Sequence, residues 1–99
     1  MSHTGSLLIL ATGIYAWRPK SVQDLTPDDF SSVLAEAGSV NFLVLGTGKT
    51  MQLTPPSIRS LFAAGTLPLE IMDTGAAVRT YNILLAEDRP PAAALIAVG

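Results

Sequence analysis

The last strand that the sequence predicts, Ala92 to Val98, consists of apolar residues only. A strand with one face in water alternates apolar and polar side chains, because successive side chains point to opposite faces of the sheet. An unbroken apolar run therefore needs cover on both faces. We expect this strand in the middle of a sheet with helices packed against it, which favours a layered α/β architecture.

The stretch before this strand, Ile71 to Arg89, predicts a strand end, a helix cap and a helix that stops before Pro90. Asp73 or Thr74 can accept a hydrogen bond from the free N–H groups of the first helical turn. Helical spacing then gives an apolar face and a second face on which small residues flank a cation and an amide. The first face comprises Ala77, Tyr81, Leu84 and Leu85, and the second comprises Gly75, Arg79, Asn82 and Ala86.

The N-terminal half begins with two short apolar runs, Leu7 to Ala11 and Ile14 to Trp17. Their short linker predicts a β-hairpin in which Gly13 takes a positive φ. The residues 26–29 then predict a helix start, with Thr26 as the cap and a proline in the first turn. We expect this helix to bury Phe30, Val33, Leu34 and Ala37 and to end at Gly38.

Two strands and one helix follow. Val40 to Leu45 is nearly all apolar and predicts a strand covered on both faces. Thr54 is the expected cap of a second helix, which buries Ile58, Leu61 and Phe62 and ends at Gly65. Leu67 to Met72 alternates, and its proline cannot donate to a ladder, so we expect an edge strand. One helix crosses between these strands, so they should run parallel.

These elements predict a single α/β domain over residues 1–99, with a mixed sheet, an N-terminal hairpin, three helices and a central last strand. A net charge of −2 argues against a nucleic-acid binder. The sequence has no cysteine, and its one histidine, His3, lies beside a terminus, so we expect no metal and no cofactor. No apolar run reaches the roughly 18–20 residues of a membrane span, and we expect a cytoplasmic protein.

Several of these segments together resemble a known family. The resemblance rests on residues 2–8, 13–17, 45–48, 72–82 and 87–89 and on Ala92, Ala93 and Ala94. The chain is similar to small domains of unknown function that include mitochondrial respiratory complex I assembly factor three and the adipogenesis-associated domain-containing protein of animals. Bacterial members are nearest in pattern. The resemblance implies an α/β fold with a mixed sheet and an interior last strand, no established activity, and a role with protein partners.

One departure from that family lies at the start of the chain. Bacterial relatives carry a further segment before the stretch that matches Met1 to Ser6, including an extended piece that adds to the sheet. Without it, a sheet edge or apolar face near Leu7 to Leu10 would stay uncovered. We therefore expect self-association or marginal stability, and the sequence leaves the oligomeric state open.

The first candidate site is the turn Gly46-Thr47-Gly48. With Lys49-Thr50 it suggests a phosphate-binding loop, but the glycine required five positions before Gly48 is replaced by Leu43, and no helix begins at once. Two interpretations remain. It is a tight turn after a strand, or its free N–H groups form a pocket for an anion or a partner's carboxylate.

The second candidate site is the pair Arg79 and Asn82, which share one helix face. Arg79 either pairs with an acid such as Asp73 or Glu87, or it binds a carboxylate or phosphate. The strand before Gly46 and the strand before Asp73 are expected to be parallel. If their carboxyl ends lie side by side, Arg79 lies near the Gly46–Gly48 turn, and Thr74 and Asn82 border the same crevice.

These observations support two hypotheses about function. The first is a non-enzymatic interaction or assembly module with a protein partner, resembling the complex I assembly factor. The alternative is a small-molecule or anion-binding domain, or a minor enzyme, that uses Gly46, Thr47, Gly48, Thr74, Arg79 and Asn82. A crevice filled by side chains favours the first, and a deep one with Arg79 unpaired favours the second.

Overall fold

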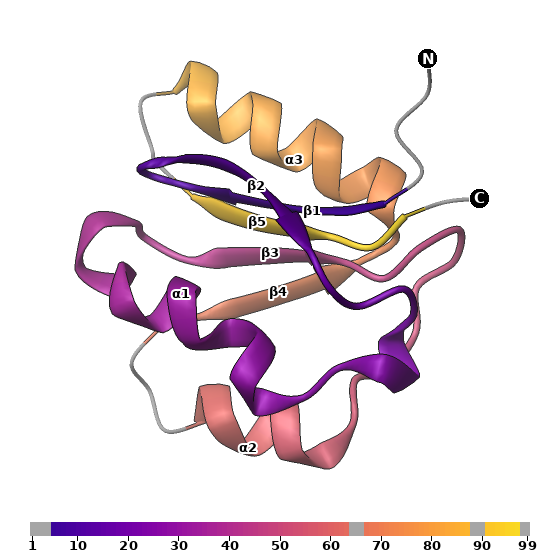
Figure 1. Cartoon of the computed structure of the whole chain (residues 1–99). Coiled ribbons are helices and arrows are strands. Elements are labelled where there is room, and N and C mark those ends of the chain that lie inside the picture. The colour runs from indigo at the N-terminus through magenta and orange to yellow at the C-terminus, as the bar shows by residue number, and fades with distance from the viewer. Residues whose placement is uncertain (1–4, 64–66, 88–90, 98–99) are drawn as a thin grey trace.

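The computed structural model describes residues 5–63, 67–87 and 91–97. One five-stranded sheet lies between two layers, with α3 on one face and α1 and α2 on the other (Figure 1). The strands are β1 (Ser6–Leu10), β2 (Gly13–Trp17), β3 (Leu43–Gly46), β4 (Leu69–Met72) and β5 (Ala92–Leu95). The α-helices are α1 (Ser31–Ala35), α2 (Pro56–Ala63) and α3 (Thr74–Ala86), and the 3-10 turns are η1 (Val22–Asp24), η2 (Pro27–Phe30) and η3 (Ala37–Ser39). The layered α/β fold is confirmed.

The last strand lies at the centre of the sheet, as its apolar sequence predicts. The strand order is β2-β1-β5-β3-β4. β5 runs antiparallel to β1 and parallel to β3, which makes the sheet mixed. Its alanines, Ala92 to Ala94, are fully buried. The strand ends at Leu95, earlier than predicted, but the chain stays tied to the sheet because the Ile96 N–H donates to the Gly46 carbonyl at 2.9 Å.

The N-terminal hairpin is confirmed. Its register pairs Ser6 with Trp17 and Leu10 with Gly13, and Gly13 has a φ of 148°. One face of the hairpin packs toward α1 and buries Leu8 and Leu10 in the core. The other face, on the side of α3, leaves Ile14 67% exposed.

β3 and β4 are parallel neighbours, and β4 forms one edge of the sheet, as predicted. β3 is buried on both faces: Leu43 and Leu45 join the core beneath α1 and α2, and Val44 packs beneath α3. It begins at Leu43, three residues later than expected. Because β3 and β4 are parallel, their carboxyl ends lie side by side. The turn that begins at Gly46 is therefore next to the start of α3.

The first predicted helix is divided into η2, α1 and η3. Thr26 is the N-cap residue, as expected, and the Asp29 carboxylate accepts from the Thr26 N–H at 2.9 Å, which is the reciprocal bond of a capping box. A 3-10 turn follows the cap, and serines and a glycine, which are weak helix formers, keep the α-helical part to five residues. Phe30 is fully buried and meets Trp17 and Phe62 edge-on, with ring centroids 5.5 and 5.2 Å apart.

The cap predicted for α2 is wrong. The Thr54 hydroxyl is buried without a hydrogen-bond partner among the described residues. The helix instead starts from Pro55, whose carbonyl accepts from the Ile58 N–H at 3.0 Å. Proline at this position needs no partner for a backbone N–H, so the helix forms without a side-chain cap. The expected helix end at Gly65 lies outside the described residues.

α3 begins where predicted, with Asp73 as its cap: the carboxylate accepts from the Ala76 N–H at 2.8 Å. Ala77 is buried against the sheet, and Tyr81 and Leu84 are half-buried. Leu85 was expected on this face but is 55% exposed. It follows Ala77 by eight positions, which rotates it about 80° around the helix axis and away from the sheet.

Candidate functional site

The turn after β3 is closed by its own residues. The Thr47 N–H donates to the Met72 carbonyl at 2.9 Å, so the turn is tied to the end of β4. The Thr47 hydroxyl, on a residue that is 2% exposed, accepts from the Gln52 N–H at 3.1 Å and lies 2.8 Å from the Thr50 carbonyl. These bonds fix the path of the chain between β3 and α2.

The start of α3 completes the closure. The Gly48 N–H donates to the Thr74 hydroxyl at 2.8 Å, and the Thr74 N–H donates to the Gly48 carbonyl at 2.8 Å. The same hydroxyl donates to the Ile96 carbonyl at 2.8 Å. The amides of Thr47 and Gly48 therefore already have partners, which agrees with the interpretation of this segment as a tight turn and not with that of an open anion pocket. Thr74 supplies the oxygen that an anion would have supplied.

Gly46 allows this close approach of turn and helix. A Cβ at this position would lie 2.8 Å from the Thr74 Cα and 3.2 Å from the Ala77 Cβ. Such a clash involves backbone and a buried side chain, neither of which can move away cheaply. Gly48 has a φ of 108°, a conformation that glycine adopts readily. The fold of the turn thus explains why glycine occupies both positions.

Arg79 and Asn82 lie on the exposed face of α3. A Cβ at Gly75 would lie 3.6 Å from Arg79 Nη1, so the guanidinium extends back over the first turn of the helix. An ion pair with Asp73 or Glu87, which is one of the two interpretations of Arg79, is not found among the described residues, where Arg18 forms both ion pairs. The hollow that Thr74 borders is lined otherwise by Gly5, Leu7, Val78, Leu95, Ile96 and Ala97, and its lining includes neither Arg79 nor the Gly46–Gly48 turn.

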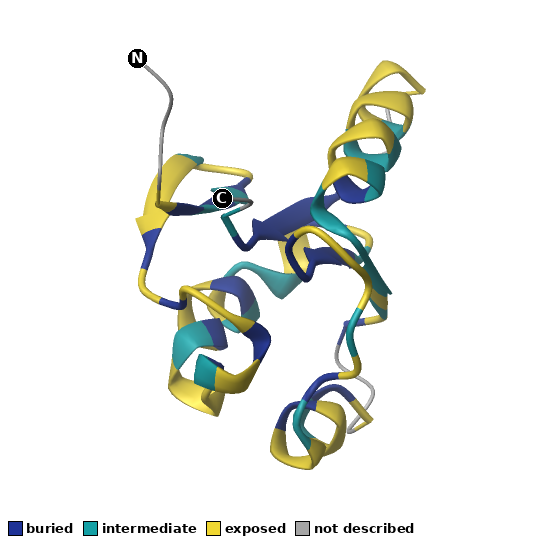
Figure 2. Cartoon of the chain, turned by 90° about the vertical axis from the view of Figure 1, so that its right-hand side faces the viewer, coloured by how far each residue is buried: buried dark blue, intermediate teal, exposed yellow. Residues whose placement is uncertain are grey.

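Three apolar side chains share the exposed side of α3 with Arg79. Val78 is 40%, Ile83 58% and Leu85 55% exposed. Helical spacing puts Val78 and Leu85 along one border of the exposed face and Ile83 along the other, with Arg79 and Asn82 between them. We call these five residues the α3 outer patch. Figure 2 shows the exposed side of α3 directed away from the sheet. The apolar part of the patch does not follow from the sequence pattern, which places Leu85 on the buried face of the helix.

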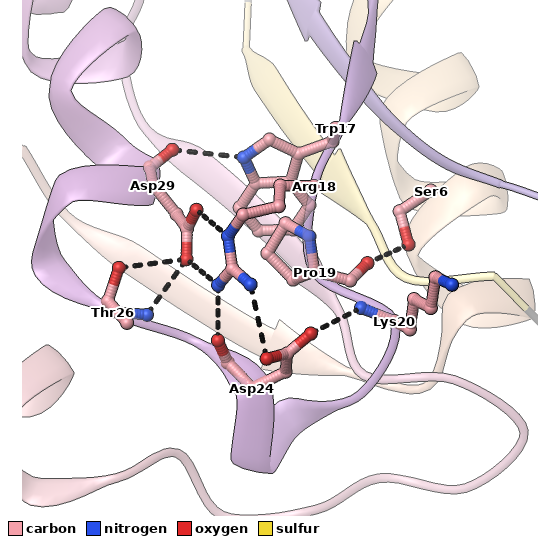
Figure 3. A network of polar contacts seen from close by, with 8 residues as sticks. All are labelled: Ser6, Trp17, Arg18, Pro19, Lys20, Asp24, Thr26 and Asp29. Carbon is pink, nitrogen blue, oxygen red and sulfur yellow. Dashed lines mark hydrogen bonds and ion pairs between the residues drawn. The ribbon is translucent and has the colours of Figure 1, made fainter.

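A second polar cluster joins the hairpin to η1 and η2 (Figure 3). Arg18 Nε donates to Asp29 Oδ1 at 2.8 Å, and its Nη2 reaches Asp29 Oδ2 at 2.6 Å. Arg18 Nη1 donates to Asp24 Oδ1 at 3.1 Å, and Nη2 also donates to the Asp24 carbonyl. These bonds hold the pKa of both carboxyls below its usual range and raise that of Arg18. The segment between β2 and η2 is thus an anchored loop.

The chemistry of the described residues sets limits on the site. In the described part of the chain, no three His, Cys, Asp or Glu side chains gather closely enough to hold a metal ion. None of the helices described is long and apolar enough to cross a membrane.

A mixed five-stranded sheet with its last strand central, and a strand-to-helix turn locked by threonine, define a small α/β domain. The chain belongs to the family described as protein of unknown function (DUF498/DUF598), whose model matches residues 1–96. This confirms the expected family.

Individual relatives agree with this membership. The chain is 33% identical over 93 residues to NADH dehydrogenase [ubiquinone] 1 alpha subcomplex assembly factor 3 of Bos taurus, covering 93% of this chain and 50% of that protein. It is 34% identical over 94 residues to an uncharacterized protein of Rhodobacter capsulatus, covering 95% and 70%. It thus spans about half the length of the assembly factors that it matches.

A solved structure extends the comparison to the fold. The crystal structure of a protein from Bartonella henselae, described as an outer membrane protein, superposes with a TM-score of 0.89 at 41% identity. The match covers 100% of this chain and 83% of that one. The shared fold includes the layered sheet described above.

Proposed function

We propose that this chain is a non-enzymatic interaction module that binds a protein partner through the α3 outer patch. The observation that carries the proposal is the exposure of Val78, Ile83 and Leu85 on the same side of α3 as Arg79, which forms no ion pair with the described residues. Apolar side chains gathered on one exposed face are typical of protein interfaces, and arginine is enriched there.

The closed turn supports a binding module over a catalytic pocket. Thr74 fills the space between Gly48 and Ile96, so Gly46, Thr47 and Gly48 serve to fix the start of α3. In this proposal Arg79 and Asn82 form the polar part of the interface, and Thr74 and the glycine turn hold the helix that presents them. The site residues expected from the sequence thus take two different roles.

The names of the relatives suggest the kind of partner. The Bos taurus relative is named as an assembly factor of NADH dehydrogenase, and we extend an assembly role to this chain as part of the proposal. A matching partner surface carries apolar side chains and a carboxylate, because a carboxylate can accept two hydrogen bonds from Arg79. We place this binding in the cytoplasm, where a chain without cysteine is unaffected by reducing conditions.

An affinity purification tests the proposal. Tagged protein is expressed in its native organism, captured, and analysed by quantitative mass spectrometry against an untagged strain. We expect enrichment of NADH dehydrogenase subunits or of proteins bound to them. Capture of no partner above background would contradict the module. Capture of a small acidic metabolite on the purified chain would favour the alternative, an anion-binding domain.

A further inference from the structure

A cleft of about 460 Å³ lies between the β1–β2 hairpin and the η2–α1 segment. It is on the face of the sheet opposite α3, and so is separate from the α3 outer patch. Its volume is within the range of small-molecule sites. Its lining comprises Leu8, Leu10, Tyr15, Ala16, Trp17, Asp28, Asp29, Ser31, Ser32 and Glu36.

The hairpin side of the cleft is apolar and aromatic. Leu8 and Leu10 are buried, and Trp17 is 9% exposed. Tyr15 is 45% exposed, which leaves much of its side chain accessible. An aliphatic stem can pack against the leucines, and a cation over an aromatic ring is attracted by the ring's negative face.

The helical side is acidic. The Asp29 carboxylate is already paired with Arg18, but the Asp28 carboxylate has no ion pair or hydrogen bond with the described residues. Glu36 Oε2 accepts from the Thr12 hydroxyl at 2.8 Å, whereas Glu36 Oε1 is buried and has no partner. Buried carboxylate oxygens normally accept at least one hydrogen bond. The residues lining the cleft include no Lys or Arg that could supply it.

Hydrogen bonds hold both ends of the cleft. At one end the Thr12 hydroxyl lies 2.7 Å from the Tyr15 hydroxyl while it donates to Glu36, which joins the hairpin turn to the end of α1. At the other end Trp17 Nε1 donates to the Asp29 carbonyl at 2.9 Å (Figure 3). The two walls are thus fixed relative to each other before any ligand arrives, which lowers the entropy lost on binding.

From this arrangement we infer that the cleft binds an ammonium or guanidinium group carried on a short aliphatic stem. The stem packs on Leu8 and Leu10, the cation lies by Tyr15 and its N–H groups donate to Glu36, while Asp28 adds negative charge toward the other end of the cleft. Such a group is presented either by a Lys or Arg side chain of an extended protein segment or by a free alkyl amine or guanidine. The inference concerns a different surface from the proposed interface and stands without it.

The test is a titration followed by ¹H–¹⁵N NMR spectra of the labelled chain. Butylguanidinium is the free cation, and butylurea is its neutral analogue of the same shape. We expect butylguanidinium to shift the Trp17 indole N–H and the amides of Ser31, Ser32 and Glu36, and butylurea to bind at least about tenfold more weakly. Equal binding of the two, or shifts elsewhere, would overturn the inference.

Variants make the assignment specific. The double variant Asp28→Asn, Glu36→Gln should weaken butylguanidinium binding by about tenfold or more. The control is the double variant Glu70→Gln, Glu87→Gln, which removes the same two charges from exposed positions on β4 and at the end of α3. An effect of equal size in the control would show a general attraction by charge and contradict a site.

Peptides distinguish the two possible sources of the cation, a protein side chain and a free small molecule. Acetyl-Gly-Arg-Gly-amide is compared with the same peptide containing citrulline, the neutral analogue of arginine. Binding of the arginine peptide about tenfold tighter than butylguanidinium identifies a protein segment, because the peptide backbone then adds contacts. Equal or weaker binding identifies a free cation. A failure of all probes to shift the cleft overturns the inference but leaves the α3 interface untouched.

Discussion

Thr74 and Gly48 hold each other through two hydrogen bonds, one in each direction. The Gly48 N–H donates to the Thr74 hydroxyl and the Thr74 N–H donates to the Gly48 carbonyl, both at 2.8 Å. This pair ties the start of α3 to the turn that follows β3. The Thr74 hydroxyl also donates to the carbonyl of Ile96, the residue after β5. The position of the outer patch therefore depends on a contact between residues far apart in the sequence.

Removing the Thr74 hydroxyl should destabilise the fold. Thr74→Val keeps the shape but leaves the Gly48 N–H and the Ile96 carbonyl without this partner. We expect a loss of about 1–3 kcal/mol in the free energy of unfolding, measured by urea denaturation. Thr74→Ser retains the hydroxyl and is the control. If valine and serine prove equally stable, the hydroxyl bonds contribute nothing.

A methyl group at Gly46 should be poorly tolerated. It would lie 2.8 Å from the Thr74 Cα, and relief of that clash must move the helix. We expect Gly46→Ala to cost about 1–3 kcal/mol by overpacking. Gly38→Ala is the matched control, because its Cβ would have no neighbour within 4 Å. The comparison is made by thermal and urea unfolding. Similar midpoints for both variants would refute the close approach.

The core and the outer patch should differ sharply in their response to truncation. Ile96 is 1% exposed, and Ile96→Ala should cost about 2–5 kcal/mol. Leu85→Ala should change stability by less than about 0.5 kcal/mol, because the side chain is largely in water. Leu84, expected in the core, is only half-buried, so its truncation should fall between the two. Equal losses at Leu85 and Ile96 in urea unfolding would show that α3 is rotated from the position described.

The Arg18 cluster should make stability depend on pH. The folded pKa of Asp29 lies below its unfolded value of about 3.9, so its contribution is fully present above that value and is lost as pH falls through the folded pKa. Asp29→Asn should cost about 1–2 kcal/mol at pH 7, since Arg18 is half exposed, and this difference from wild type should shrink in acid.

The measurement for the cluster is the urea midpoint of both proteins from pH 7 to about pH 2. Asp28→Asn is the control, because Asp28 has no partner among the described residues. A gap between wild type and Asp29→Asn that stays constant down to the lowest pH would contradict the ion pair.

Patterns along the chain predicted most of the fold. The apolar run at Ala92 placed β5 at the centre, Gly13 marked the hairpin, and Pro68 marked the edge, because each reflects a local requirement of the backbone. The Thr54 cap failed although the motif was present. A cap motif shows only that a hydrogen bond is possible. Whether the bond forms depends on how the surrounding loop packs.

The candidate site was predictable only in part. Parallel strands brought Thr74 to the Gly46–Gly48 turn, as expected from the topology. Nothing in the sequence showed that the Thr74 hydroxyl would accept a hydrogen bond from the turn, because such a bond depends on distances of tenths of an ångström between two segments. The anchoring role of Arg18 was missed for the same reason: its acids lie six and eleven positions away in a loop without periodicity.

The most direct test of the account compares partner capture by two charge-reversed proteins. Arg79→Glu reverses the cation of the α3 outer patch, and Arg59→Glu reverses an exposed cation on α2, across the sheet. Each is purified from the native organism beside the wild type, with equal expression and equal thermal midpoints as controls. We predict that Arg79→Glu lowers recovery of the wild-type partners by about tenfold or more while Arg59→Glu retains them. Full recovery with Arg79→Glu would contradict the proposed interface.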